Sequence, residues 1–521
     1  MSDKKLSDVN TIKEYEKMIL AGPADFQTAI AASGFGKFNI VLLLLFIPLG
    51  WTLHFEALLI SFVVPAASCD LNMTPYQKGV LNSMSFFGMA ATGLVWGFLL
   101  DTLGRRKVML YGYIIESLAV IGAGLSSNFY LLSAFKFLGG AIAGGAYVGL
   151  STYLHEFHGT KYRSKVQMIL ASVYASGSIV MPLLASAILP LKIQFKWYFI
   201  ELHSWNVLIL VTASLPIMSV LAIAFLPETP IYLMSSGDND GAMDIFRTIY
   251  YINTGKRKES YPIQQLIEEI QENKEQILKE SRWQRLKSSI QQVAPLYGSK
   301  HRNKLILACA IQGLIQLVIN VIYVIMPQIF QATHEYQHLH NGTDSTLCNV
   351  LDLLRSPNVT EEIVECSPNL DSSFTVYLSA MIMVSVSVAG YAFAGTVINF
   401  TGRKKFLYVM GFASAIVGNC MYFSNSETTT LILSSLYLAT ANLCFDTVVT
   451  DIVVIFPTSL RAMALSMSNL TGRALTVVGS TLFPFLVELG CAPPFVTYGC
   501  LILAAILLSI LVPSTDNMDI K

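Results

Sequence analysis

Ionisable side chains lie within long apolar stretches of the sequence, and five of them are the first candidates for chemistry. A charge in a membrane-spanning helix costs roughly 3 kcal/mol on insertion scales, so it usually faces a cavity or an opposite charge. Carboxylates in a cavity can bind protons or cationic solutes. We therefore predict a substrate or proton site among these side chains, which are Glu56, Glu116, Asp446, Asp451 and Arg473.

Three of these residues also have a structural interpretation. Asp446 and Arg473 lie at similar depths in their stretches, so they could neutralise each other as a structural pair. Glu56 stands beside His54 near one end of its stretch and could be exposed to water. The functional hypothesis is that Asp446 and Glu56 line a central cavity and bind a cationic substrate or a proton.

A second group of charges belongs to an internal repeat. The run GFLLDTLGRRK at 97–107 recurs 298 residues later as GTVINFTGRKK at 395–405. The same offset carries Arg163 onto Arg461. Two separated matches at one offset predict a duplication, in which each half presents a basic turn after its second span.

One enzyme motif is present and is set aside. The run HEYQH at 334–338 matches the zinc-binding pattern HExxH. A catalytic zinc ion needs a third protein ligand and a cleft in a sizeable domain, whereas this run lies in a short loop. We therefore predict that the protein is not an enzyme and that it has no metal site and no cofactor.

The elements that position these residues follow from composition. The 521 residues are 53% hydrophobic and 13% charged, whereas a soluble domain has roughly a quarter charged residues. A helix needs about 20 apolar residues to cross a membrane. The sequence predicts an all-α polytopic protein with twelve transmembrane helices in two six-helix bundles. The predicted spans are 40–64, 79–100, 108–126, 129–153, 166–189, 205–226, 305–329, 374–398, 406–424, 430–456, 462–487 and 494–513.

The distribution of Lys and Arg predicts the orientation. Most of the 34 Lys and Arg residues fall on one side of the predicted spans, which places both termini in the cytosol. The sequons at Asn72, Asn341 and Asn358 then lie on the opposite face, where they could be glycosylated. The zero formal net charge gives no indication of nucleic-acid binding, and we predict none.

The loop at 331–373 on that opposite face holds Cys348 and Cys366. These two residues could form a disulfide in an oxidising compartment. Two free thiols are the alternative.

The repeat and the spans divide the chain into segments. Within the linker, 241–251 and 263–290 have the apolar spacing of amphipathic helices and could brace the two halves; a solvated linker is the alternative. The predicted segments are a cytosolic arm at 1–37, a bundle at 38–226, a linker at 227–304, a second bundle at 305–513 and a cytosolic tail at 514–521.

The repeated turn resembles the signature motif of the major facilitator superfamily. Glu156 with Arg163, the run LPETP at 226–230 and the run FPTSLR at 456–461 are similar to its sugar-porter and organic-cation branch. With GFGKF at 34–38, the pattern most closely resembles synaptic vesicle glycoprotein 2 and its relatives. The resemblance covers nearly the whole chain and implies the major facilitator fold.

The resemblance also implies a gating role for the motif residues. In the family, these charges tie the halves together on the cytosolic side when the site opens outward. Asn399 and Val454 depart from the acidic residues expected at their positions, so the latch of the second half should be weaker or uncoupled from protons. The predicted gating residues are Asp101, Gly104, Arg105, Arg106, Glu156, Arg163, Glu228, Gly402, Arg403 and Arg461.

The predicted function is transport of a small organic solute, such as a sugar or an organic cation, across a lipid bilayer by alternating access. A proton or another ion would be the coupling partner. The membrane would be the plasma membrane or that of a secretory or synaptic vesicle. The alternative is a carrier-fold protein that no longer transports and acts in vesicle trafficking or partner binding.

Overall fold

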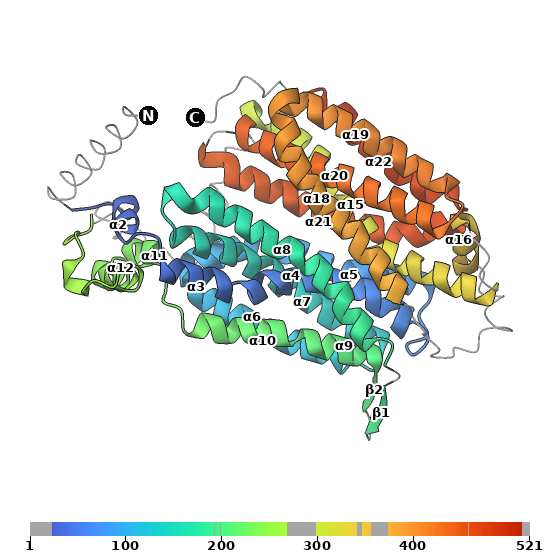
Figure 1. Ribbon diagram of the computed structural model, residues 1–521, viewed down its shortest axis with the longest axis horizontal. Coiled ribbons are helices and arrows are strands. Elements are labelled where there is room, and N and C mark those ends of the chain that lie inside the picture. The colour runs from blue at the N-terminus through green and yellow to red at the C-terminus, as the bar shows by residue number, and fades with distance from the viewer. Residues whose placement is uncertain are drawn as a thin grey trace.

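Long helices account for most of the chain in the computed structural model (Figure 1). The helices of the first half of the sequence, drawn from blue to green, pack together, and those of the second half, drawn from yellow to red, form a second group beside them. The structure describes residues 23–191, 193–197, 200–267, 298–340, 346–355, 374–456 and 458–512.

Each of the twelve predicted spans lies in a helix or in a pair of consecutive helices. In the first half these are α3 (Lys37–Leu45) with α4 (Ile47–Ala67), α5 (Pro75–Leu103), α6 (Arg105–Gly124), α7 (Phe129–Glu156), α8 (Thr160–Ile188), and α9 (Ser204–Thr212) with α10 (Ser214–Ala224). In the second half they are α15 (Ser299–Leu339), α18 (Phe374–Thr401), α19 (Arg403–Cys420), α20 (Glu427–Ile455), α21 (Thr458–Glu488) and α22 (Ala492–Ser509).

Membrane-spanning character is strong in most of these helices. Ten of the described helices are long and apolar enough to cross a membrane. The other two spans are α5, which is rich in small and polar residues, and α18, whose most apolar stretch is Phe374–Gly390. The prediction of an all-α protein with twelve spans in two bundles is confirmed.

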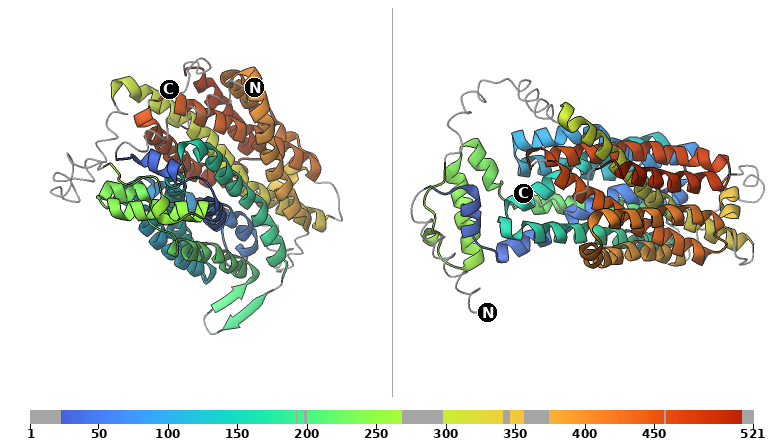
Figure 2. Two further views of the ribbon diagram at one scale, coloured as in Figure 1. Left: turned by 60° about the vertical axis from the view of Figure 1, so that its left-hand side comes forward. Right: turned by 90° about the horizontal axis from the view of Figure 1, so that it is seen from above.

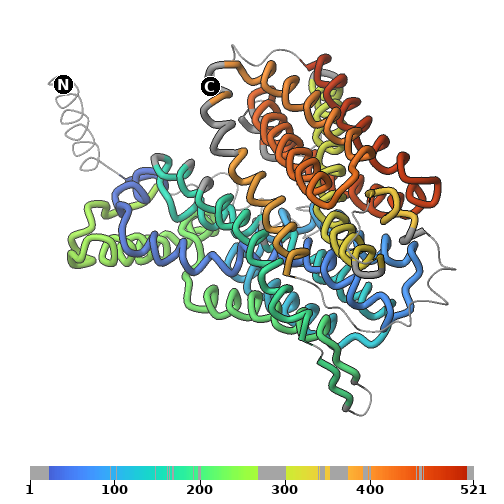
Figure 3. Tube along the Cα trace, turned by 45° about the vertical axis from the view of Figure 1, so that its right-hand side comes forward, coloured from blue at the N-terminus to red at the C-terminus, as the bar shows by residue number. Residues whose placement is uncertain are grey.

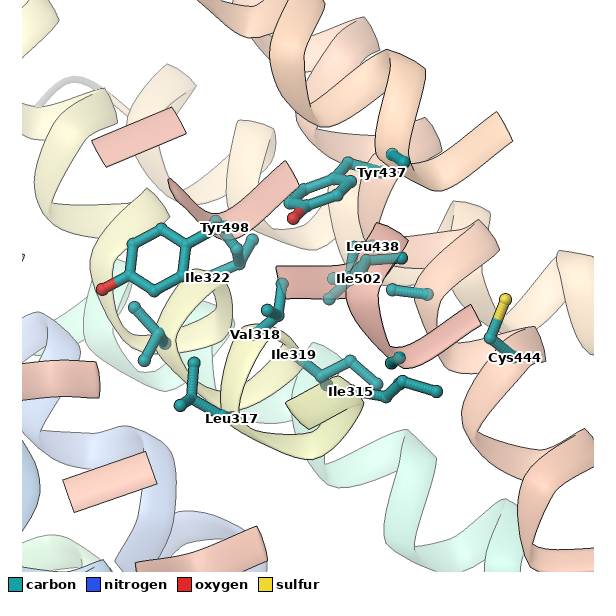
Figure 4. Close-up of a cluster of buried hydrophobic side chains, with 14 of the residues drawn as sticks. Ile315, Leu317, Val318, Ile319, Ile322, Tyr437, Leu438, Cys444, Tyr498 and Ile502 are labelled. Atoms are coloured by element: carbon teal, nitrogen blue, oxygen red, sulfur yellow. The ribbon is translucent and has the colours of Figure 1, made fainter. Parts of the chain in front are cut away.

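Apolar side chains give each half its own interior. In the second half, Ile315, Val318 and Ile322 of α15 form one buried cluster with Tyr437 of α20 and Tyr498 of α22 (Figure 4). The Tyr498 hydroxyl donates a hydrogen bond to the carbonyl oxygen of Gly479 at 2.9 Å, so this polar atom is satisfied in an apolar surrounding. Two further buried clusters are formed almost entirely by residues of the first half.

Glycines let α5 and α7 approach closely. The sequence places Gly140, Gly144, Gly145 and Gly149 along one stripe, which predicts close packing. The structure confirms it, because a Cβ atom on Gly140 would lie 2.6 Å from the Cα atom of Ser85 on α5. Side chains of α5 also reach the α7 backbone: the Trp96 indole N–H donates to the Ala141 carbonyl oxygen at 2.7 Å.

The two halves meet at the end of the molecule that carries a β-hairpin, which we call the hairpin end. The hairpin consists of β1 (Gln194–Trp197) and β2 (Ile200–His203), and hydropathy did not predict it. Near this end the Gln328 side-chain amide of α15 donates to Asn82 Oδ1 of α5 at 3.1 Å. The rings of Tyr76 on α5 and Phe485 on α21 lie 5.9 Å apart.

Toward the opposite end the helix axes of the two halves diverge (Figure 3). This end carries the cap, which we define as α2 (Phe26–Ala32), α11 (Pro230–Ser236), α12 (Asn239–Thr254), the 3₁₀ turn η1 (Lys258–Ser260) and the residues up to Leu266. The cap lies across the ends of the membrane helices, and the hairpin projects from the other end (Figure 2). We call this second end the cap end.

The cap joins the N-terminal arm to the linker. The Asn253 side-chain amide donates to the carbonyl oxygens of Ser33 and Gly34, at 3.2 and 3.0 Å. The Tyr261 hydroxyl donates to the Ala29 carbonyl oxygen at 2.6 Å, and burial raises the pKa of this hydroxyl. The predicted amphipathic segment 241–251 lies within α12, whose buried side chains include Phe246. Most of the second predicted segment, 263–290, falls outside the described residues.

The disulfide prediction was wrong in its pairing. Cys348 is bonded to Cys491, with the two Cα atoms 5.1 Å apart. Cys348 lies on α16 (Leu347–Arg355), which packs against the 3₁₀ turn η2 (Met421–Phe423) and α21, and this brings it to the start of α22. Proximity in sequence does not determine disulfide connectivity, which depends on this folding back. Cys366 lies outside the described residues.

The glycosylation predictions remain untested. Asn341 and Asn358 lie outside the described residues. Asn72 is exposed in the turn before α5, where its φ of 47° is the left-handed conformation that Asn tolerates better than most residues.

The packing of α5 on α7 yields a matched pair of substitutions. We expect Gly140→Ala to lower the thermal unfolding midpoint, because overpacking costs about 1–3 kcal/mol. Gly97→Ala is the control, because nothing lies within 4 Å of a Cβ atom at Gly97 and alanine favours a helix. Equal midpoints for the two variants in detergent would contradict the close contact.

Candidate functional site

A buried ion pair lies in the interior of the first half. Lys136 Nζ on α7 is 2.8 Å from Glu56 Oε1 on α4, and both side chains are at most 3% exposed. The Ser85 hydroxyl of α5 donates to the same oxygen at 2.9 Å, and Lys136 also donates to the Glu56 carbonyl oxygen at 3.2 Å. The interpretation of Glu56 as exposed to water was therefore wrong, because the side chain is paired and buried.

A glycine on α7 makes room for this carboxylate. A Cβ atom on Gly139 would lie 2.8 Å from Glu56 Oε1. Close helix approach thus lets Lys136 reach α4 and excludes other side chains from the pair. Sequence reasoning missed Lys136 as a site residue. The available signal was a lysine in an apolar span of the half whose other spans hold Glu56 and Glu116, because such a lysine needs an acidic partner.

Glu116 of α6 lies beside the pair. Its side chain is fully buried, and within the described part of the chain neither carboxylate oxygen has a hydrogen-bond partner. It lies within electrostatic reach of both Glu56 and Lys136. The structure therefore brings two of the five predicted ionisable residues together in one cluster of the first half.

The other three predicted residues belong to the second half. Asp446 is exposed and Asp451 is buried, and both lie on α20. Asp451 lines a cavity of about 520 Å³ near the cap end, together with Lys304 and Lys404. Arg473 of α21 faces the first half, because a Cβ atom on Gly144 of α7 would lie 3.1 Å from Arg473 Nη1. The proposed pairing of Asp446 with Arg473 stays a prediction.

Amide and hydroxyl side chains line α15 at helical spacing, which the sequence reasoning did not single out. Gln312 Nε2 donates to Asn469 Oδ1 at 2.8 Å, and Asn320 Nδ2 donates to Thr476 Oγ1 at 3.1 Å. The Asn442 amide donates to the Tyr323 hydroxyl at 3.5 Å. The available signal was the recurrence of amides every four residues in an apolar helix, at Gln312, Gln316 and Asn320, because residues four apart share one helix face.

The predicted gating residues of the first half form a network at the cap end. Arg105 Nε is 3.1 Å from Glu156 Oε1, and its guanidinium lies 5.8 Å from the ring centre of Tyr232. Glu228 Oε1 accepts hydrogen bonds from the backbone N–H groups of Arg106 and Thr229, at 2.9 and 3.1 Å. These contacts join α6, α7 and α11 and lie within the first half. The side chain of Asp101 lies outside what the structure describes.

Glycine is required in the turn before α6. Gly104 has a φ of 94°, and a Cβ atom there would lie 2.6 Å from Glu228 Oε2. Gly402, which precedes Arg403 at the start of α19, has the same left-handed character with a φ of 78°. The repeated sequence therefore forms the same turn in both halves.

Arg163 and Arg461 have equivalent contacts. Arg163 Nε donates to the carbonyl oxygen of His158 at 3.2 Å, five residues before it. Arg461 Nε donates to the carbonyl oxygen of Phe456 at 3.0 Å, also five residues before it. A cation near the C-terminal carbonyl groups of a helix is stabilising. Both arginines thus brace the ends of α7 and α20.

Comparison with known proteins shows which family this chain resembles. The family model described as sugar (and other) transporter matches residues 50–342, which is more than half of the chain. The Caenorhabditis elegans protein svop-1 is 24% identical over 492 residues, covering 93% of this chain and 84% of that protein. Synaptic vesicle glycoprotein 2A of Rattus norvegicus is 24% identical over 253 residues, which are 46% of this chain and only 32% of that protein.

Solved structures agree on the fold. The xylose transporter XylE from E. coli in a partially occluded inward-open conformation matches with a TM-score of 0.64 at 14% identity, covering 92% of this chain and all of that one. A second structure of XylE, inward open, matches with the same TM-score at 16% identity. At such identities the likeness establishes the fold alone.

The chain therefore belongs to the sugar (and other) transporter family, within the major facilitator superfamily. It is an integral, multi-pass membrane protein, and its relatives and fold are those of transporters and not of enzymes. The family resemblance and its similarity to synaptic vesicle glycoprotein 2 are confirmed.

The ion pair generates a stability prediction. We expect Lys136→Met to lower the free energy of unfolding by about 3–5 kcal/mol, because the buried Glu56 side chain loses its cation and must take up a proton to stay buried. The double variant Glu56→Gln with Lys136→Met should recover much of this loss. Lys196→Met is the control, because Lys196 and Glu201 form an exposed pair. A double variant no more stable than the single one would argue against the pair.

Proposed function

We propose that this protein carries a small organic solute across a membrane by alternating access, with the two bundles rocking about a central site. The observation that carries the proposal is the uneven contact between the bundles. They touch near the hairpin end through Asn82 with Gln328 and Tyr76 with Phe485. Toward the cap end the helix axes of the two bundles diverge (Figure 3).

Charge distribution supports placing the cap end in the cytosol. Lys and Arg are retained on the cytosolic side of membrane proteins, and the basic turns at 104–107 and 402–405 both lie at the cap end. On this orientation the bundles are closed toward the lumen or the cell exterior and diverge toward the cytosol.

This geometry gives the gating residues a physical role. When the site opens outward, the cap ends must come together. The basic turn of the second bundle would then face the acidic groups of the first, whereas Asn399 and Val454 leave the second half without the matching acids. Glu228 holds the Arg106 backbone, and Glu156 holds Arg105, so the first-half turn is already ordered before the ends meet. Preordered turns reduce the entropy lost on closure.

The polar side chains of the second half support a hydroxyl-bearing solute as the substrate. Gln316, Asn320 and Tyr323 on α15 are partly exposed, and amide groups both donate and accept hydrogen bonds. The exposed carboxylate of Asp446 on the neighbouring α20 would add a site for a cationic group or a proton. A sugar, an amino sugar or a polar amine fits this set of groups. The membrane we propose is the plasma membrane or that of a vesicle.

Uptake into proteoliposomes tests the proposal. We expect at least one of a panel of sugars, amino sugars and amines to accumulate saturably and faster with an inward pH gradient. Asn320→Ala should raise KM about tenfold if the lost hydrogen bond to the solute contributes about 1.4 kcal/mol. Asn349→Ala on the exposed α16 surface is the matched control, with unchanged KM.

One outcome would contradict transport. If no member of the panel moves while the purified protein keeps a cooperative thermal transition, the non-transporting alternative, a carrier-fold protein of vesicle trafficking, replaces the proposal. If a solute moves and Asn320→Ala leaves KM unchanged, the assignment of the α15 face to the substrate fails.

A further inference from the structure

Four helices bring polar groups together inside the first bundle. The groups are Glu56 of α4, Ser85 of α5, Glu116 of α6 and Lys136 of α7, and each side chain is at least nine-tenths buried. If every ionisable group carried its charge, one lysine would offset only one of two carboxylates. The cluster would then bury a net charge of about −1 in the interior of a membrane bundle, which costs several kcal/mol.

The contacts show which carboxylate is compensated. Glu56 Oε1 receives both the Lys136 ammonium and the Ser85 hydroxyl. Within the described chain, Glu116 receives no hydrogen bond at either oxygen. A carboxylic acid loses far less solvation than a carboxylate when it is buried without partners. The least costly state of the cluster therefore keeps one proton, and Glu116 is the residue that lacks any other means of neutralisation.

The helices around Glu116 offer no other cation at its level. α9 and α10 pack against α6, and neither contains an ionisable side chain. On α4 the other titratable side chain is His54, whose Nε2 faces Ser178 of α8. On α6 itself, Tyr113 donates its hydroxyl to the Leu49 carbonyl oxygen at 3.3 Å.

Most of the remaining ionisable groups of α5 and α7 lie toward helix ends. On α5 these are Tyr76 and Lys78 near the hairpin end and Asp101 near the cap end. On α7 they are Tyr130 near the start, Tyr147, and the group from Tyr153 to Glu156 near the cap end. Glu56 and Lys136 are the charged groups within electrostatic reach of Glu116.

We propose that Glu116 is a proton-binding site, and that the cluster exchanges one proton there while Lys136 stays paired with Glu56. On release, the O–H bond of the Glu116 carboxyl breaks. The proton passes to water on the side of the membrane toward which the two bundles are open. The cluster charge then changes from zero to −1. The new carboxylate attracts Lys136, which weakens its pairing with Glu56.

Coupling to transport rests on the proposed function. α4, which carries Glu56, also packs against α15 of the second half. A Lys136 side chain shared between Glu56 and Glu116 would loosen the contact between α4 and α7 and change how the first bundle sits against α15. Protonation would thus favour one arrangement of the bundles over the other, as a coupling proton must.

The proton site is tested without any substrate. Infrared difference spectroscopy of the purified protein in nanodiscs detects the carbonyl stretch of a buried protonated carboxyl group, which shifts in heavy water. We expect this band in the wild type and its loss in Glu116→Gln. Charge counting also predicts its loss in Glu56→Gln, because Lys136 would then neutralise Glu116. Lys136→Met should give a second protonated carboxyl. Glu201→Gln on the exposed hairpin is the control and should keep the band.

The outcomes separate this inference from the proposed function. A band that persists in Glu116→Gln overturns the proton site, whether or not the protein transports. If a solute is found, Glu116→Gln should still exchange it across the bilayer but lose accumulation driven by a pH gradient. Gradient-driven accumulation equal to the wild type would also overturn the assignment. Failure of every solute to move, with the infrared pattern intact, removes transport and leaves the proton site.

Discussion

The ion pair between Glu56 and Lys136 is the interaction on which the first bundle depends. Water is not available in the bilayer interior to solvate a charge, so each buried carboxylate needs a cation or a proton. Lys136 can reach Glu56 only because Gly139 leaves space at the carboxylate and the glycines of α7 allow close packing. The same requirement leaves Glu116 as the group that must be neutral. The need to neutralise the buried carboxylates therefore accounts both for the proton proposed on Glu116 and for the close packing of α4 to α7.

The duplication gives both bundles the same turns and braces, and the buried cluster of Glu56, Glu116 and Lys136 lies in the first bundle. Gly104 and Gly402 adopt the same left-handed turn, and Arg163 and Arg461 bind equivalent carbonyl oxygens. The second bundle instead uses amides and hydroxyls on α15, α20 and α21. These amides and hydroxyls fit the hydroxyl-bearing solute that we propose, and the buried charges of the first bundle fit the proposed proton site.

Features that depend on local sequence could be predicted. The twelve spans follow from hydropathy, and the shared turns follow from a repeat of motif and spacing. Features that depend on tertiary contacts could not be predicted from the sequence. The partner of Glu56 required knowing that α4 lies beside α7, and the pairing of Cys348 with Cys491 required knowing that α16 folds back onto α21 and the start of α22. The predicted gating charges Arg105 and Glu156 do pair, and this pair joins α6 to α7 of the first bundle.

The bundles meet near the hairpin end, and the alternating access that we propose requires them to separate there. Joining Asn82→Cys to Gln328→Cys with a short bifunctional thiol reagent, in a variant lacking the other free thiols, tests it most directly, since these side chains are in contact. For a solute that the uncoupled variant carries, the account predicts that complete cross-linking stops uptake and that a monofunctional reagent does not. Full uptake by the cross-linked protein would contradict the account.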